Sequence, residues 1–274
     1  MSASLATEVT GVAAATADGA EQAVGATGAG GAAPPVRHIA VVVPVHNEEK
    51  LLGSCLRQVR RAMDVLQRER SACSVALTVV LDRCTDGSAD IARDICAMDP
   101  RVAVVAGEFG SVGAARSAGI EAALHRAGRQ STAAMADVWV ACTDADSAVP
   151  DHWLTGFAAL ADTGADAVTG TVEPEPASIP PALLRSWRTK YSAQEAHTRV
   201  HGANLGVRAS TYLAVGGFTA AAEHEDVRLV EAIRAAGGAV LPSDQLQVVT
   251  SGRLRGRTPS GFAGYLARLQ QTGH

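Results

Sequence analysis

The sequence predicts an α/β fold in which a mostly parallel central sheet is flanked by helices. From His38 onward, short apolar runs rich in β-branched residues alternate with helical stretches, as in a chain of βα units. The apolar runs are nearly continuous, which is typical of parallel strands that are buried on both faces. With 274 residues and 47% hydrophobic residues, the chain can bury such a sheet in one large domain or two small ones.

Each element follows from its local pattern. We expect strands at Ile39–Val45, Val75–Leu81, Val102–Ala106 and Asp137–Thr143, with helices between them at 48–68, 88–98 and 112–125. Pro150 suits a first helical turn, so a helix is expected over 151–161. A strand at 165–176 and an amphipathic helix at 181–199 follow. The remaining pattern is less regular: HGANLGVRA at 201–209, a turn at Gly216 and Gly217, a helix at 225–236, a strand at 246–250 and a last helix from Ser260.

Composition excludes several classes of protein. The formal net charge is −4 and no basic stripe is present, so nucleic acid is not expected as a partner. The five cysteines are scattered without a CxxC pair, which indicates reduced thiols and a cytoplasmic protein. No run reaches the roughly 18 to 20 apolar residues of a transmembrane segment. Peripheral contact with a membrane and a homodimer are left open.

The N-terminal segment differs from the rest of the chain. Residues 1–36 are rich in Ala and Gly and have almost no large apolar side chains, so we expect a disordered tail without a readable function. The remainder, 37–274, is expected to form a single domain.

Polar groups follow three of the predicted strands: PVHNEE the first, LDRCTDGS the second and TDADS the fourth. In open α/β sheets, ligands bind beyond the carboxyl ends of the strands. Asp144 and Asp146 could be ordinary turn residues, but two carboxylates on one short loop could also share a divalent cation that cancels their repulsion.

Six segments together resemble the ordered motifs of family 2 glycosyltransferases with the GT-A fold. They are IAVVVPVHNEEKLLGSCL, VVLDRCTDGSADIA, GSVGAARSAGIEAAL, DADS, GANLGVRASTYLAVGGF and HEDVRLVEAI. The resemblance implies an enzyme that moves a sugar, with inversion, from a nucleotide-sugar donor to a hydroxyl of a small-molecule, lipid or glycan acceptor. A UDP-sugar is favoured, and the cofactor is Mg²⁺ or Mn²⁺. Residues 37–146 would form the nucleotide-binding half and 147–274 the acceptor-binding half.

The resemblance also implies roles for individual residues near the donor. Glu48 would reach the ribose, Asp82 the imide of the base, and Arg116 the nucleotide or its diphosphate. Asp144 would lean toward ribose and metal, and Asp146 would bind the metal. The remaining expected donor contacts are Pro44, His46, Asn47, Arg253 and Arg257. The chain departs from the family pattern at three positions: it has His46 where tyrosine or phenylalanine is common, Arg83 in place of a second aspartate, and Ser117 in place of asparagine.

The acceptor side of the reaction is expected in the second half. By resemblance, Asp226 is the general base and Glu225 its alternative, although acids in a first helical turn also serve as caps and suit the helix dipole. Asn204, Arg208 and Trp153 are the candidate acceptor contacts. Trp187 could stack on a sugar face or simply pack.

Other readings compete with this one. The arginines of TSGRLRGR are either a surface charge run or clamps, as in the retaining glucosyl-3-phosphoglycerate synthases, which leaves the stereochemical outcome open. A sugar-1-phosphate nucleotidylyltransferase would carry GxGTRLxPLT near its first strand, and PVHNEE is unlike it. A non-catalytic nucleotide-sugar-binding module is disfavoured by the intact aspartates, and a dehydrogenase by the missing GxGxxG.

Overall fold

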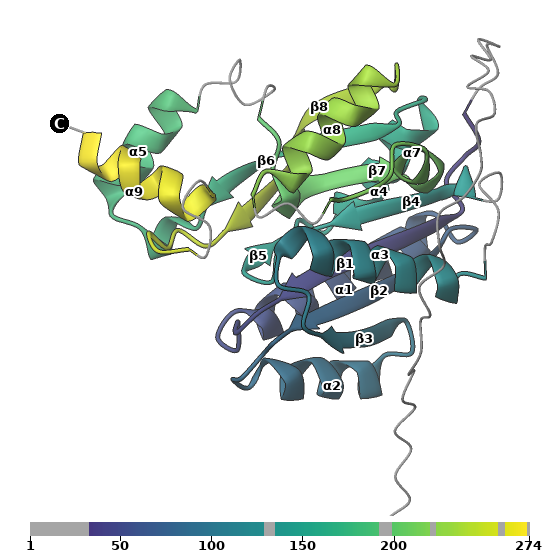
Figure 1. Cartoon of the computed structure of the whole chain (residues 1–274), viewed down its shortest axis with the longest axis horizontal. Helices are drawn as coiled ribbons and strands as arrows, with labels where there is room; N and C mark the ends of the chain where they lie inside the picture. Colours follow the sequence, from purple (N-terminus) through teal and green to yellow (C-terminus); the bar gives the residue numbers. More distant parts are fainter. Residues whose placement is uncertain (1–32, 129–134, 192–198, 220–222, 257–260, 273–274) are drawn as a thin grey trace, which may run out of the picture. The chain divides into compact units, whose positions relative to one another are not determined.

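A single eight-stranded sheet organises the domain (Figure 1). The computed structural model describes residues 33–128, 135–191, 199–219, 223–256 and 261–272. Among these residues the strand order is β3-β2-β1-β4-β7-β6-β8-β5. The strands are β1 (His38–Val45), β2 (Ser74–Asp82), β3 (Val102–Gly107), β4 (Val138–Cys142), β5 (Ser147–Ala148), β6 (Ala167–Pro174), β7 (Leu205–Arg208) and β8 (Val240–Thr250).

The sheet has a parallel half and a mixed half. Strands β3, β2, β1 and β4 are all parallel, as their continuous apolar runs predict. Strand β7 is antiparallel to both β4 and β6, β8 is parallel to β6, and the short β5 is antiparallel to β8. The predicted fold class, a mostly parallel sheet flanked by helices, is therefore confirmed.

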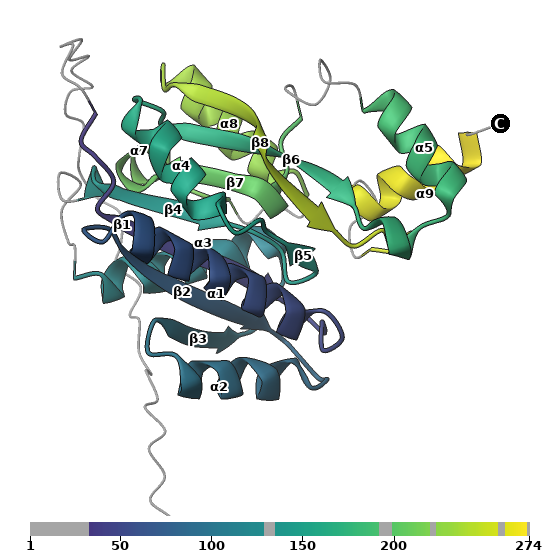
Figure 2. The same ribbon diagram turned by 180° about the vertical axis from the view of Figure 1, so that it is seen from behind.

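Helices cover both faces of the sheet, as Figures 1 and 2 show from opposite sides. Buried side chains of α1 (Leu52–Glu69), α2 (Ser88–Met98) and α4 (Trp153–Asp162) share one core. Those of α3 (Val112–Arg126), α7 (Ala209–Ala214) and α8 (Glu225–Ala235) share another. Alternation along β1 feeds both cores, because Val41 and Val43 lie in the first and Val42 in the second.

A third, smaller core lies apart from the sheet faces. Helices α5 (Pro181–Lys190) and α9 (Phe262–Thr272) pack on each other through Leu183, Trp187, Leu266 and Leu269. The 3-10 turn η2 (Pro176–Ser178) leads from β6 toward α5, and η3 (Gly202–Asn204) precedes β7. Gly202 and Ala203 of η3 line the cavity described below.

The structure extends or shortens several expected elements. Strand β8 begins at Val240 rather than at 246, and the segment 201–209 contains η3 and β7. Helix α5 ends at Lys190, and 192–198 lie outside the described residues. Val36, the last residue of the expected tail, is buried and its N–H donates to Asp162 Oδ1 at 2.8 Å. No helix in the described segments has the length and apolar character to cross a membrane.

Candidate active site

The loops at the carboxyl ends of β1, β2 and β4 open onto a cavity of about 1110 Å³. Many of the residues expected at a site line it together. They are Pro44, His46, Glu48, Asp82, Arg116, Asp144, Asp146, Glu225, Asp226 and Arg253. The parallel half of the sheet brings the first of these together, because its strands all end at the same edge.

Asp82, the last residue of β2, is held at one end of the cavity. Its Oδ1 accepts hydrogen bonds from the backbone N–H groups of Phe109 (2.8 Å) and Gly110 (3.3 Å). Its backbone oxygen lies 2.6 Å from Nδ1 of His46. These contacts fix the carboxylate and leave Oδ2 able to accept from a ligand.

The loop after β1 is held by the loop after β2. Asn47 adopts a left-handed conformation (φ 54°), and its Oδ1 accepts from the N–H of Thr85 at 2.7 Å. The N–H of Glu48 donates to the hydroxyl of Ser88 at 2.8 Å. Asn47 is therefore a loop anchor outside the cavity lining, whereas Glu48 is buried and lines the cavity.

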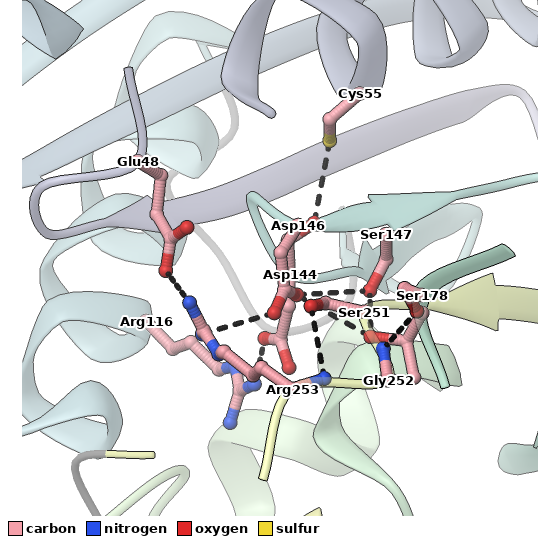
Figure 3. A network of polar contacts seen from close by, with 11 residues as sticks. Glu48, Cys55, Arg116, Asp144, Asp146, Ser147, Ser178, Ser251, Gly252 and Arg253 are labelled. Atoms are coloured by element: carbon pink, nitrogen blue, oxygen red, sulfur yellow. Dashed lines mark hydrogen bonds and ion pairs between the residues drawn. The ribbon is translucent and has the colours of Figure 1, made fainter. Parts of the chain in front are cut away.

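Asp144 and Asp146 lie on the loop between β4 and β5 (Figure 3). The hydroxyl of Thr250, the last residue of β8, donates to Asp146 Oδ1 at 3.3 Å and so helps to hold this loop in place. Burial and the neighbouring charge of Asp144 raise the pKa of Asp146 to about 6, although Arg253 acts in the opposite direction. The two carboxylates are thus a repelling pair that any added cation stabilises.

Arg116, in α3, joins the aspartate loop to helix α8. Its guanidinium donates to Asp144 Oδ1 at 2.5 Å and to Glu225 Oε1, and its side chain is only 2% exposed. Burial alone would lower the pKa of Arg116, but the carboxylates of Asp144 and Glu225 raise it overall, so the group stays charged. A Cβ atom at Gly202 would lie 2.4 Å from the guanidinium, so only glycine permits this approach.

Two acids open helix α8. His224 precedes the helix in a left-handed conformation (φ 62°) and is followed by Glu225 and Asp226. Glu225 is buried in the ion pair with Arg116, and burial raises its pKa. Asp226 is more accessible: its Oδ2 accepts from the N–H of Gly202 at 2.6 Å, and its Oδ1 from the N–H of Val227 at 2.8 Å.

The charges around the aspartate loop favour a divalent cation. Glu48, Asp144, Asp146 and Glu225 supply four carboxylates, opposed by the guanidinium groups of Arg116 and Arg253. Carboxylates therefore outnumber guanidinium groups around this loop. No cluster of three or more His, Cys, Asp or Glu ligands occurs in the described part of the chain. The carboxylate oxygens of Asp144 and Asp146 are donors that suit a hard cation such as Mg²⁺ or Mn²⁺, which completes its shell with water and phosphate oxygens.

Three expected acceptor contacts do not reach the cavity. Asn204 is fully buried: its Oδ1 accepts from Trp153 Nε1 at 2.9 Å, and its Nδ2 donates to the backbone oxygens of Thr171 (2.8 Å) and Leu246. Arg208 is 4% exposed and donates to backbone oxygens, including that of Ala161 at 2.7 Å. Because their polar atoms are already satisfied inside the protein, the assignments of Asn204, Arg208 and Trp153 to acceptor binding are corrected to structural roles.

Two further expectations have different outcomes. Trp187 lines the cavity but is buried, and its ring stacks on Tyr191 with a centroid distance of 4.3 Å. Arg257 lies outside the described residues.

Sequence reasoning missed several residues of the cavity. Phe109 and Gly110 follow β3 at the same sheet edge as Asp82, so the GEFGS segment after that strand was a usable signal. His201 also lines the cavity, 3.1 Å from the hydroxyl of Tyr191, and burial lowers its pKa to about 4. No pattern in the sequence pointed to His201, because lone histidines are common in many environments.

Comparison with known proteins identifies a family. The family model described as glycosyl transferase family 2 matches residues 40–211. No curated protein matches the chain.

Solved structures share the fold at low sequence identity. The mannosyltransferase PcManGT from Pyrobaculum calidifontis, in complex with GDP-Man and Mn²⁺, has a TM-score of 0.56 at 20% identity, over 81% of this chain and 60% of that one. TarS 1–349 from S. aureus, in complex with UDP, has a TM-score of 0.55 at 15% identity, over 86% and 65%. Glucosyl-3-phosphoglycerate synthase from Mycobacterium tuberculosis, in complex with phosphoglyceric acid, has a TM-score of 0.51 at 16% identity, over 86% and 80%. The chain thus spans less than two thirds of the length of the first two structures.

Proposed function

Because the chain belongs to glycosyltransferase family 2, we propose that it moves a sugar from a nucleotide-sugar donor, with a UDP-sugar favoured, to a hydroxyl group with inversion at the anomeric carbon. The observation that supports this most is that three groups of carboxylates, carried by different parts of the chain, line one cavity. Glu48 follows β1 and Asp82 ends β2, Asp144 and Asp146 lie on the loop between β4 and β5, and Asp226 lies in the first turn of α8; all five line the cavity.

The donor end of the cavity offers complementary groups for a nucleoside diphosphate. Oδ2 of Asp82 accepts an N–H of the base, and the buried carboxylate of Glu48 accepts from a ribose hydroxyl. The guanidinium of Arg253 supplies a rigid fork of donors that matches phosphate oxygens. Residues 37–146 then form the donor half and 147–274 the acceptor half.

Asp144 and Asp146 are the residues that would hold Mg²⁺ or Mn²⁺. When bound, the cation neutralises the charge that develops on the leaving nucleoside diphosphate. The fit rests on the repelling carboxylate pair and on the excess of negative charge around it. The mannosyltransferase structure with Mn²⁺ supports the same assignment by analogy of fold.

Asp226 is the proposed general base. Its carboxylate takes the proton of the acceptor hydroxyl as that oxygen attacks the anomeric carbon. The bond from the anomeric carbon to the diphosphate oxygen breaks, and its electron pair stays on the diphosphate. Glu225 suits this role less well, because it is buried and one of its carboxylate oxygens is held by Arg116. Glu225 is therefore assigned to positioning Arg116.

The substitution Asp226→Asn tests the proposed function. The amide keeps the shape of the side chain but cannot take the proton, so turnover should fall by about 10² to 10⁴. Donor affinity, measured by titration calorimetry, should stay unchanged. Asp94→Asn, on an exposed position of α2, is the matched control and should keep full activity. Turnover close to wild type in Asp226→Asn would remove Asp226 as the base.

Two further measurements define the reaction. A panel of nucleotide sugars, titrated with Mn²⁺ and with a chelator, identifies the donor and checks the metal requirement. The anomeric configuration of the first-formed product, observed by NMR, checks the stereochemistry, and retention would contradict direct attack assisted by Asp226. A wild-type protein that binds the donor but transfers nothing to any acceptor would favour a binding module.

A further inference from the structure

Arg253 bridges two carboxylates that the proposed function assigns to different ligands. Its guanidinium donates to Glu48 Oε1 at 2.7 Å and lies 2.9 Å from Asp146 Oδ2 (Figure 3). Glu48 is the proposed ribose contact, and Asp146 is a proposed metal ligand. A guanidinium that touches both lies between the nucleoside and metal positions.

Resting on the proposed function, we propose that Arg253 is an internal stand-in for the metal ion: it neutralises Asp146 and Glu48 in the ligand-free protein and transfers to the donor diphosphate when metal and donor bind. Arg253 therefore has two alternating partners. Both are anionic: the carboxylates of Asp146 and Glu48 in the ligand-free protein, and the diphosphate once metal and donor are bound.

The burial of the two carboxylates explains why a stand-in is needed. The side chains of Glu48 and Asp146 are 7% and 10% exposed. Removing the cation next to a buried carboxylate leaves an uncompensated charge, which is strongly destabilising. In the ligand-free protein Arg253 is the positive group that faces Glu48 and Asp146, and at Asp146 the bound metal ion would take over this role.

The two arginines of the site differ in their freedom to move. Arg116 is 2% exposed and enclosed between Asp144 and Glu225, so it is a fixed part of the structure. Arg253 is 38% exposed, so its guanidinium can leave the carboxylates without crossing packed protein. Arg253 is thus the cation of this pair that is able to exchange.

The backbone around Arg253 is anchored while its side chain is not. The N–H of Gly252 donates to the hydroxyl of Ser178 at 2.8 Å, and a Cβ atom at residue 252 would lie 1.9 Å from a side-chain carbon of Ile179. The close packing of Gly252 against Ser178 and Ile179 fixes the backbone two residues after the end of β8. Because the backbone is fixed, only the side chain of Arg253 can move. Its length is enough for the guanidinium to shift from Asp146 to a diphosphate bound next to it.

This arrangement has a measurable consequence for metal binding. In the absence of donor, Mn²⁺ must compete with the guanidinium for Asp146, so its affinity is reduced. With donor present, the diphosphate receives the guanidinium and the competition ends. Metal and donor should therefore bind with positive coupling, and the coupling should depend on Arg253.

The experiment measures Mn²⁺ binding to the nucleotide-free protein by the loss of the free-ion EPR signal. Arg253→Gln should raise the Mn²⁺ affinity about tenfold, since it removes two charge contacts that are partly screened. The same variant should lower the affinity for UDP at saturating Mn²⁺ about tenfold, because a forked phosphate contact is lost. Arg255→Gln, an exposed arginine outside the cavity lining, is the matched control and should change neither value.

Arg253→Lys keeps the charge without the fork and provides a second variant. It should retain the low Mn²⁺ affinity of the nucleotide-free wild type while losing part of the UDP affinity. An unchanged or lower Mn²⁺ affinity in Arg253→Gln overturns the stand-in role. If wild-type protein binds no UDP at any Mn²⁺ concentration, the proposed function fails instead, and the two failures are distinguishable.

Discussion

Replacing Asp146 by asparagine should stabilise the metal-free protein. Asp146 is buried beside Asp144, and its pKa is raised from 3.8 to about 6, which is opposite to the usual behaviour of a paired aspartate. A raised pKa means that the folded protein disfavours the ionised form. The resulting penalty is absent below pH 3.8, grows as the pH rises toward 6, and is constant above that value.

The magnitude follows from the size of the shift. A change of about two pKa units corresponds to about 3 kcal/mol at 1.36 kcal/mol per unit. The attraction of Arg253, which lowers the pKa of Asp146, is already included in this shift and is not subtracted a second time. The gain should be about 3 kcal/mol at pH 8 and should approach zero near pH 4.

Urea unfolding followed by tryptophan fluorescence, in the presence of a chelator, measures this gain between pH 4 and pH 8. Asp94→Asn is the control, because it removes a carboxylate from an exposed site. If Asp146→Asn is as stable as wild type or less stable at pH 8, the electrostatic account of the carboxylate pair is wrong.

Adding Mn²⁺ should largely cancel this difference in stability between wild type and Asp146→Asn. A ligand present at 100 times its Kd stabilises the native state by about 2.7 kcal/mol, and only the wild type keeps both proposed metal ligands. The variant should therefore be the more stable protein in chelator and gain less from Mn²⁺. Equal gains in the two proteins would place the ion elsewhere.

Three other predictions test the framework around the cavity. Asn204→Ala should cost about 3 kcal/mol of stability in urea unfolding, because it leaves buried polar groups unsatisfied, while the KM for the acceptor stays unchanged; a change confined to KM would return Asn204 to the acceptor site. Gly202→Ala should weaken UDP binding in calorimetry by displacing Arg116, whereas Gly53→Ala, where an added Cβ meets its nearest neighbour at 3.5 Å, should not; equal affinities would show that Arg116 adapts. Removal of residues 1–32 should leave the Tm unchanged, and a large decrease would show that this segment supports the domain.

The parallel half of the sheet could be predicted because its signal is local. Each of β1 to β4 is a nearly continuous apolar run, a pattern that indicates a strand buried on both faces. The burial is observed for β1, β2 and β4, whereas β3 lies at the edge of the sheet and only its Val102 is buried. Strand β7 could not be recognised in this way. It has only four residues, Leu205–Arg208, and includes both a glycine and an arginine. The first half of β8 is equally unclear, since it contains Pro242 and several polar side chains.

The candidate site could be predicted where its acidic residues lie at the carboxyl ends of strands. Asp82, Asp144 and Asp146 end strands or follow them directly, so topology alone brings them together. Asn204 and Arg208 failed because a polar residue in a glycine-containing segment looks the same in sequence whether it faces a ligand or is satisfied by backbone groups inside the protein. Only the packing of distant elements decides between these alternatives.

The antiparallel pairing of β7 with both β4 and β6 has a mechanical consequence. Backbone hydrogen bonds link β4 through β7 to β6, and so join the strands of the proposed donor half to those of the proposed acceptor half. A hinge rotation of one half against the other would break the backbone hydrogen bonds between β4, β7 and β6. The two halves therefore do not move as separate rigid bodies. Adaptation to a new substrate must come from the rim segments. Exchanging such segments should alter which sugar or acceptor is used while the underlying sheet keeps its rigidity.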